Sequence, residues 1–306
     1  MGIVMGLALS VKDLKKSYGD FKALNSISFD VKEGEIFGIL GPNGAGKSTT
    51  LECIEGIKSF DSGTIEVFGE NINNSTYNKL IGVQLQSTSL QNNITVLEAM
   101  KFFCKWQKRK VRTDLLDRFG LKDQYKKQYS KLSTGQKRRL HLALAIANDP
   151  KILILDEPTA GLDVEGRVSL HEEIHKLNKN GVTIILASHD MAEVEALCDR
   201  IAIFVKGEIR TIGVARDIIA EGNKDKRIVF KTLNDSLVNY NKFKESKLVQ
   251  KSESYITLSA TDITESLLEI ITLVKENKDT IIDFKIEGLS LEDRFIEVIN
   301  VDGEVN

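Results

Sequence analysis

The sequence predicts an α/β protein with a parallel sheet at its centre. Three apolar runs, at residues 151–156, 183–188 and 200–205, lack polar alternation and are separated by helical patterns. Continuous runs of this kind are typical of parallel strands that are buried on both faces. A fourth short apolar run, 35–40, leads directly into a glycine-rich segment and then into a helical pattern. We therefore expect a parallel sheet covered by helices on both sides.

The glycine-rich segment reads Gly-Pro-Asn-Gly-Ala-Gly-Lys-Ser-Thr and fits the pattern G-x-x-x-x-G-K-[ST] between a strand and a helix. Its glycines let successive N–H groups face inward, and the helix N-terminus adds to this anion cradle. Lys47 would supply charge for the terminal phosphates and Ser48 a hydroxyl for Mg²⁺. A glycine-rich turn without a ligand is disfavoured by the complete match. The predicted ATP-binding residues are Gly41, Pro42, Asn43, Gly44, Ala45, Gly46, Lys47, Ser48 and Thr49.

The segments around this core suggest two subdomains. Residues 7–14 and 26–32 alternate apolar with polar side chains, as half-buried antiparallel strands do, and short strands are expected at 62–69 and 80–86. Between about 90 and 148 the pattern turns helical. We therefore expect an N-terminal antiparallel β-subdomain and an inserted α-helical subdomain.

A change in composition at residues 221–226 predicts a domain boundary. The first domain would span 1–220, and 221–306 would form a small α+β accessory domain, with a ferredoxin-like arrangement as one candidate. The predicted strands and helices of this second part follow in the order 227–230, 248–251, 255–258, 263–275, 281–286 and 291–299. No catalytic constellation is visible there.

Two carboxylates stand at the carboxyl end of the apolar run at 151–156. Ligands of parallel sheets bind at the carboxyl ends of the strands, where Asp156 and Glu157 are expected. Asp156 would hold the hydration shell of Mg²⁺, and Glu157, one residue further, would polarise an attacking water. An ordinary acidic turn is the alternative, but the phosphate-binding loop upstream favours the catalytic interpretation.

Residues 132–139 read Leu-Ser-Thr-Gly-Gln-Lys-Arg-Arg, with Ser133 as a candidate N-cap. Here the chain resembles the ABC-type ATPase family, whose signature loop reads LSGGQ. The resemblance extends from about residue 7 to 215. It places Gln86 in the Q-loop and Asp163 in the D-loop. It also makes His189 the switch histidine and Tyr18 the aromatic residue that stacks on adenine.

The resemblance implies that two copies enclose each triphosphate between them. One copy would supply the phosphate-binding loop, and the other a set of residues in trans: Ser133, Thr134, Gly135, Gln136 and Asp163. Gln86 would contact Mg²⁺, together with Ser48 and Asp156, and the attacking water, while His189 would contact the γ-phosphate. Thr134 stands where the family commonly has its second glycine, which narrows the backbone angles allowed there.

Composition limits the biological role. The 42 basic and 44 acidic residues give a net charge of −2, so no global field favours nucleic acid, and no nucleic-acid partner is expected. Three separated cysteines fit a reducing cytoplasm. No run of about 18 apolar residues predicts a spanning helix, so transport would need a separate integral permease, with this chain peripheral on the cytoplasmic face of the membrane.

The segment 288–297 resembles the closing segment of ATPase subunits of bacterial drug, antibiotic-immunity and sodium exporters. The expected function is therefore an energy-coupling exporter subunit that hydrolyses ATP with Mg²⁺ and pairs with a second ATP-binding subunit, either another copy or a relative. Two alternatives stay open: a soluble ABC-type ATPase acting in translation or DNA maintenance, and an importer subunit. A long coiled-coil insertion of the DNA-repair type does not fit the roughly 45 residues between Gln86 and Leu132.

Overall fold

A computed structural model describes residues 6–72, 79–84, 90–222, 225–252, 255–288 and 290–300. The chain forms two compact units that meet in sequence at Ala215 and Arg216. Each unit is a separate packed body with its own hydrophobic core.

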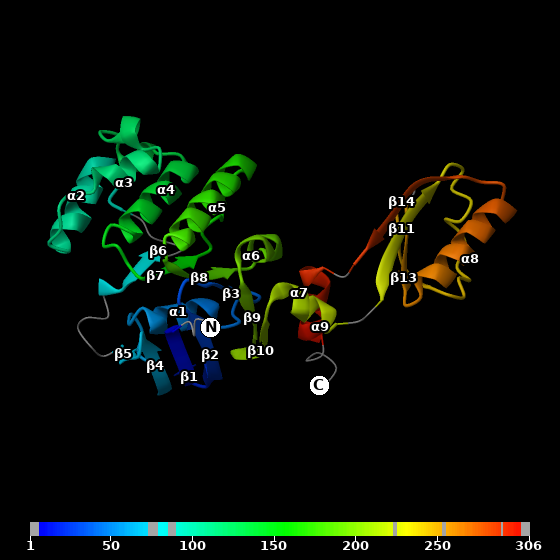
Figure 1. Cartoon of the computed structure of the whole chain (residues 1–306), viewed down its shortest axis with the longest axis horizontal. Coiled ribbons are helices and arrows are strands. Elements are labelled where there is room, and N and C mark those ends of the chain that lie inside the picture. The colour runs from blue at the N-terminus through cyan, green and yellow to red at the C-terminus, as the bar shows by residue number, and fades with distance from the viewer. Residues whose placement is uncertain are drawn as a thin grey trace, which may run out of the picture. The chain divides into compact units, whose positions relative to one another are not determined.

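The first unit is organised around a six-stranded sheet (Figure 1). Five of its strands run parallel and are almost completely buried, which confirms the expectation from the apolar runs; β10 pairs antiparallel with β9 at one edge. In spatial order the strands are β10 (Glu208–Gly213), β9 (Arg200–Val205), β3 (Ile36–Leu40), β8 (Thr183–Ser188), β7 (Ile152–Asp156) and β6 (Ile81–Gln84).

An antiparallel sheet packs on one side of this core, as the alternating segments predicted. Helix α1 (Lys47–Ile54) shares a hydrophobic cluster with strands of both sheets, and the ring of Phe29 stacks on that of Phe37 with centroids 5.4 Å apart. The strands of this second sheet, in spatial order, are β2 (Phe21–Lys32), β1 (Leu7–Tyr18), β4 (Ser62–Val67) and β5 (Glu70–Asn71).

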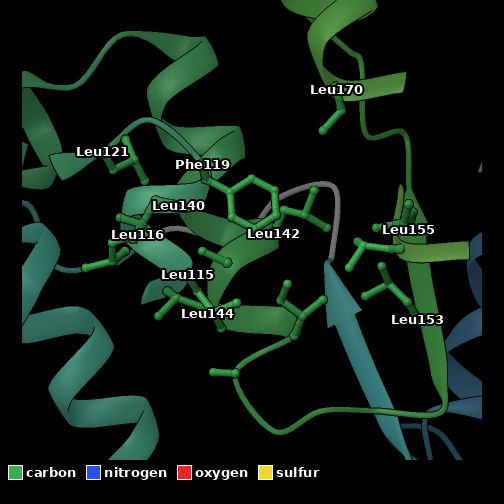
Figure 2. Packing of buried hydrophobic residues seen from close by; sticks show 14 of the residues in the cluster. Leu115, Leu116, Phe119, Leu121, Leu140, Leu142, Leu144, Leu153, Leu155 and Leu170 are labelled. Carbon is green, nitrogen blue, oxygen red and sulfur yellow. The ribbon is translucent and has the colours of Figure 1, made fainter. Parts of the chain in front are cut away.

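The predicted helical block packs on the opposite side of the core. Its leucines converge with Phe119 on Leu153 and Leu155 of β7 and on Leu170 of α5, so the helices are anchored to the strand that carries the acidic pair (Figure 2). The block contains α2 (Val96–Trp106), α3 (Thr113–Arg118), the 3₁₀ turns η2 (Lys122–Gln124) and η3 (Tyr129–Lys131), and α4 (Thr134–Ala145). Helices α5 (Val164–Lys179) and α6 (Met191–Leu197) connect the later strands.

The second unit is a four-stranded antiparallel sheet with helix α8 on one face. Its buried cluster joins Ile228 and Phe230 of the sheet to Ile270 and Val274 of the helix. The elements are α7 (Ala215–Ala220), β11 (Lys226–Thr232), β12 (Lys247–Lys251), β13 (Ile256–Ala260), α8 (Ile263–Glu276), β14 (Ile281–Glu287) and α9 (Leu291–Asn300), and the strand order is β12-β13-β11-β14.

This order differs from the ferredoxin-like candidate. Ferredoxin-like folds follow the order β-α-β-β-α-β, with a helix between the first two strands. Here residues 233–246 connect β11 to β12 without a helix. The backbone N–H groups of Asn234 and Ser236 donate to the carboxylate of Asp279, which holds this segment as a turn.

No helix within the described residues is long and apolar enough to cross a membrane.

Candidate functional site

The phosphate-binding loop connects buried strand β3 to helix α1. Gly46 is the N-cap of α1 and has a φ of 105°, a conformation that side chains with a Cβ rarely adopt. A Cβ there would lie 2.8 Å from the carbonyl oxygen of Ala23, and one at Gly41 would lie 2.6 Å from that of Phe204. The glycines therefore let the loop pass close to neighbouring backbone while its N–H groups and the helix N-terminus form an anion cradle.

Lys47 lies inside the curl of this loop. Its side chain is buried, and Nζ donates hydrogen bonds to the carbonyl oxygens of Gly41 at 2.7 Å and Pro42 at 3.2 Å. Burial lowers the pKa of Lys47, and the nearby carboxylates of Glu157 and Asp156 partly oppose this shift. The ammonium group is thus positioned by the loop itself, beside the acidic pair.

Asp156 and Ser48 meet at the end of β7. The Ser48 hydroxyl donates to Asp156 Oδ2 at 3.2 Å, while Oδ1 is buried and has no hydrogen-bond partner. Burial raises the pKa of Asp156, and the bond from Ser48 acts in the opposite direction. One hydroxyl and one carboxylate with an unpaired buried oxygen are a donor set that suits Mg²⁺. These two residues could therefore hold the cation that accompanies a nucleotide.

Glu157 is held in a strained backbone conformation next to this pair. Its φ is 49°, and its backbone N–H donates to the carbonyl oxygen of Ala187 on β8 at 2.9 Å. The buried carboxylate oxygen Oε1 lies 2.8 Å from Nδ1 of His189, whose side chain is largely exposed. The structure thus brings together two of the three predicted catalytic residues. The third, Gln86, lies outside the described residues.

A cavity of about 190 Å³ opens over the phosphate-binding loop. It is lined by residues 43–49, by Asp156 and Glu157, and by two aromatic residues, Tyr18 and Phe21. These aromatics pair across the β1–β2 turn and are 45 % and 62 % exposed. The sequence indicated Tyr18 but missed Phe21, although a large apolar side chain directly after the Gly19–Asp20 turn was an available signal.

The signature segment begins helix α4 through a local capping box. Ser133 is the N-cap: its hydroxyl accepts from the N–H of Gln136 at 3.2 Å, and the Gln136 side chain accepts from the N–H of Ser133 at 3.1 Å. Thr134 is the first residue of α4, and its backbone is not in the left-handed region. A threonine therefore fits at this position, where the family commonly has glycine. Thr134 is exposed and Gly135 half-buried.

Asp163 is the N-cap of α5, and its carboxylate accepts from the N–H of Gly166 at 2.9 Å. The starts of α4 and α5 line a second cavity, of about 530 Å³, which also includes Arg138 and Gly161. No residue that lines this cavity also lines the one over the phosphate-binding loop. The predicted site residues that the structure describes therefore fall into two separate groups.

Sequence comparisons agree with this geometry. A family model described as "ABC transporter" matches residues 24–160. The chain is 39 % identical over 218 residues to the linearmycin resistance ATP-binding protein LnrL of Bacillus subtilis (strain 168), covering 69 % of this chain and 70 % of that one. The chain belongs to the ABC transporter ATP-binding family. It is an ABC-type ATPase, and about two thirds of the chain has the fold of the ABC cassette.

Other relatives of this ABC subunit differ in the direction of transport that their names state. The Nod factor export ATP-binding protein I of Rhizobium etli is 40 % identical over 222 residues, with 70 % of each chain covered. The methionine import ATP-binding protein MetN of Clostridium tetani is 36 % identical over 224 residues, covering 69 % of this chain and 70 % of that one.

A solved ABC cassette gives the structural counterpart. The dimeric structure of MJ0796 in a post-hydrolysis state, bound to ADP and Pi, is 26 % identical and superimposes with a TM-score of 0.62. The match covers 67 % of this chain and 98 % of that one. The ABC cassette thus accounts for about two thirds of the present chain.

Proposed function

We propose that this ABC ATP-binding subunit drives an exporter, using ATP hydrolysis at the phosphate-binding loop. The observation that carries the hydrolytic part is the contact between Glu157 and His189 beside the Ser48–Asp156 pair. Export is supported by relatives named for linearmycin resistance and Nod factor export, and by the resemblance of residues 288–297 to exporter tails. Import is the second candidate, since a methionine import subunit is a comparable relative.

The loop residues Gly41 to Thr49 would bind the phosphates through backbone N–H groups, and Lys47 would exchange its bonds to Gly41 and Pro42 for phosphate oxygens. Tyr18, with Phe21 beside it, would provide the surface on which adenine stacks. Ser48 and Asp156, with Gln86, would hold Mg²⁺, which when bound neutralises charge on the phosphate oxygens. These groups would hold the terminal phosphate in the cavity that Glu157 also lines.

Glu157 would act as the general base. A water molecule placed by Glu157 and Gln86 attacks the γ-phosphorus, the bond to the β-phosphate oxygen breaks, and a carboxylate oxygen of Glu157 accepts the proton of the water. His189 holds the carboxylate through Nδ1 and would contact the γ-phosphate with its other ring nitrogen. The buried position of the carboxylate and its fixed histidine partner restrict the rotamers available to it.

A second subunit would complete each site. The trans group, Ser133, Thr134, Gly135, Gln136 and Asp163, lies at two helix N-termini that line a separate cavity from the phosphate-binding loop. Helix N-termini suit anions, so the start of α4 would meet the γ-phosphate of the facing subunit. The dimeric state of the MJ0796 cassette supports this arrangement, in which an isologous contact creates two sites at once.

ATP-binding subunits of ABC transporters generally pair with membrane permeases. We infer that this chain likewise binds a separately encoded integral permease and lies peripherally on the cytoplasmic face of the membrane. The permease would select the exported substrate, for which a drug, a peptide antibiotic, an ion or a lipid-like compound are the candidate classes.

The test is to purify the tagged chain from its native membranes, identify the polytopic protein that accompanies it, and reconstitute the complex in liposomes. With ATP added outside, only complexes whose ATP-binding subunits face outward are active. Accumulation of a probe such as linearmycin inside these vesicles would support export, and Glu157→Gln complexes serve as the inactive control. ATP-driven loss of preloaded methionine would indicate import, and salt-sensitive recovery of RNA or DNA without a membrane protein would reject the proposal.

A further inference from the structure

Strand β14 is an open edge of the sheet in the second unit (Figure 1). Three of its side chains are large, apolar and accessible: Ile282, Phe284 and Ile286 are 51 %, 37 % and 42 % exposed. They alternate with Asp283 and Lys285, which are exposed as well. Within the described residues, the strand thus presents an apolar and charged pattern along an edge that no further strand covers.

Phe284 and Ile286 of β14 lie on the face of the sheet that α8 covers. Phe284 pairs with Phe230 and Ile286 with Ile228 across the two strands, and paired residues point to the same face. Phe230 and Ile228 are completely buried in the cluster with α8, whereas their partners on β14 are not. The hydrophobic face therefore extends past the helix to the edge of the sheet.

The two edges of this sheet differ in how they are protected. At the opposite edge, β12 begins and ends with lysine and has a register break between Leu248 and Gln250. Lysines and bulges are features that prevent an edge strand from pairing with another chain. Strand β14 pairs without interruption from Glu287 to Asp283, and its own register shift lies at the beginning of the strand, between Asp283 and Ile281. From Asp283 to Glu287 its edge is regular and suits the addition of another strand.

We propose that β14 pairs antiparallel with β14 of a second copy of this chain, about a two-fold axis through Phe284. The sequence Ile-Asp-Phe-Lys-Ile of residues 282–286 is self-complementary in this register. Phe284 faces Phe284 of the second copy, each Ile282 faces Ile286, and each Asp283 faces Lys285. Phe284 and Ile286 then lie on the face covered by α8, both charged pairs unite opposite charges, and only at the strand ends does Glu287 face an apolar residue, Ile281.

The alternative registers fail for electrostatic or packing reasons. An axis through Asp283 places two aspartates opposite each other, and an axis through Lys285 opposes two lysines and places Asp283 against Glu287. A shift to an odd register sets apolar residues against charged ones. Charge complementarity thus favours a second copy of this chain as the partner of β14, and it favours a single register.

This contact goes beyond the ATP-dependent pairing of the cassette, because it requires no nucleotide. It is isologous, so it forms a closed dimer with an eight-stranded sheet. By holding two copies together, it would raise the effective concentration of one cassette for the other. The nucleotide-free chain is therefore expected to be dimeric.

A charge-swap experiment tests the register. We expect the nucleotide-free full-length chain to sediment as a dimer, and Asp283→Lys or Lys285→Asp to raise the dissociation constant about tenfold or more, because each places like charges opposite each other. The double variant should recover wild-type dimerisation. Within one copy, Asp283 accepts from the Tyr255 hydroxyl and Lys285 pairs with Glu287, and both contacts stay disrupted in the double variant. Recovery would therefore come from the contact between copies.

Cysteine cross-linking tests the axis. Facing residues of antiparallel strands have Cα atoms about 4.5–5.5 Å apart, within the range of a disulfide. Phe284→Cys should therefore form covalent dimers on oxidation without nucleotide. Ile282→Cys alone should not, because its two copies are about 13 Å apart along the strands, but it should cross-link when mixed with Ile286→Cys. Cys53 and Cys104 are buried, and burial raises the pKa of the Cys198 thiol, so the unsubstituted chain is a suitable background and control.

The proposal is wrong if the nucleotide-free chain sediments as a monomer at its highest soluble concentration, or if Phe284→Cys cross-links no better than Ile282→Cys. Thermal unfolding of each variant checks that the second unit remains folded. If the β14 contact is not found, the proposals of ATP hydrolysis and export still stand, because ATP-dependent dimerisation is measured separately with Glu157→Gln.

Discussion

The two groups of candidate site residues are built in different ways. Lys47, Asp156 and Glu157 are only 7 %, 6 % and 6 % exposed; Lys47 begins helix α1 after buried strand β3, and the two carboxylates lie at the end of buried strand β7. Ser133 and Thr134 are exposed, and their conformation depends on a capping box formed within four residues. The phosphate-binding half is thus preorganised by the core, whereas the signature half is a helix terminus presented to a partner. Mutations should therefore have larger effects in the first group.

The largest expected effect is that of Glu157→Gln. Removing the general base should reduce ATP turnover by at least about 100-fold, while the loop still binds ATP because its own contacts are unchanged. Steady-state phosphate release measures turnover. Gel filtration with ATP should show a stable dimer also when Asp283→Lys is combined with Glu157→Gln, a change that weakens the nucleotide-independent contact through β14. The exposed Glu172 on α5 provides the control, and Glu172→Gln should hydrolyse ATP at the parent rate. Parent-level turnover by Glu157→Gln would contradict the assigned role.

Lys47→Ala should act on binding itself. The variant loses a buried, charge-assisted donor to the terminal phosphates, which predicts a loss of about 10- to 100-fold in ATP affinity. Isothermal titration calorimetry with ATP and Mg²⁺ measures it. The exposed Lys101 on α2 is a matched control, because Lys101→Ala removes the same charge outside both cavities. If Lys47→Ala binds ATP as tightly as Lys101→Ala does, the loop is not the phosphate site.

Sequence alone predicts those parts of the site that depend on local pattern. The phosphate-binding loop, the acidic pair after β7 and the N-cap Ser133 each occupy a few consecutive residues, and the structure has the expected elements there. Contacts such as that between Glu157 and His189 depend on β7 and β8 being neighbours in the sheet. No local pattern encodes that adjacency.

The same limit explains the second unit. Its strands and helices follow the apolar periodicity, but the ferredoxin-like candidate required a helix between the first two strands. Residues 233–246 are instead held by Asp279, which lies far along the chain. Burial of single charged groups was also not predictable. Glu55 ends an ordinary helical pattern in the sequence, yet both of its carboxylate oxygens are buried without a partner.

Glu55 gives the phosphate-binding half a distinctive pH dependence. Burial, with smaller contributions from Asp156 and Glu52, raises the pKa of Glu55 to about 7 from 4.5. Between these two pH values the Glu55 carboxyl is ionised in the unfolded chain but still protonated in the folded one. This residue therefore makes the free energy of unfolding fall as pH rises from about 4.5 to 7. Glu55→Gln should remove that fall and stabilise the protein at pH 8 by on the order of 2–3 kcal/mol. Urea unfolding at several pH values measures it, with Glu172→Gln as the control.

His141 on α4, in the signature half, changes the stability with pH in the opposite direction. Burial, with smaller contributions from Arg138 and Lys137, lowers the pKa of His141 to about 4, and its Nε2 lies 2.9 Å from the Tyr129 hydroxyl. The unfolded chain takes up the proton near pH 6.5, so this residue makes stability fall as pH drops from about 6.5 to 4. In Glu55→Gln the free energy of unfolding should therefore rise up to about pH 6.5 and then level off. A continued fall toward pH 7 would mean that another buried acid is responsible.

The smallest effect is expected at Thr134. This residue is the first of α4, with a backbone that accommodates a Cβ, and its methyl group points toward Gly161, where an added Cβ would lie 3.6 Å from it. Thr134→Gly removes an exposed side chain and adds backbone freedom at a helix end, which predicts a loss of stability below about 1 kcal/mol. The capping box between Ser133 and Gln136 is untouched, so the rate of ATP turnover should stay within about threefold of the parent rate.

Ser133→Ala, which removes the cap itself, is the comparison and should have the larger effect on both stability and turnover. A larger change in turnover for Thr134→Gly would mean that the threonine side chain, and not only the helix terminus, contacts the nucleotide across the dimer.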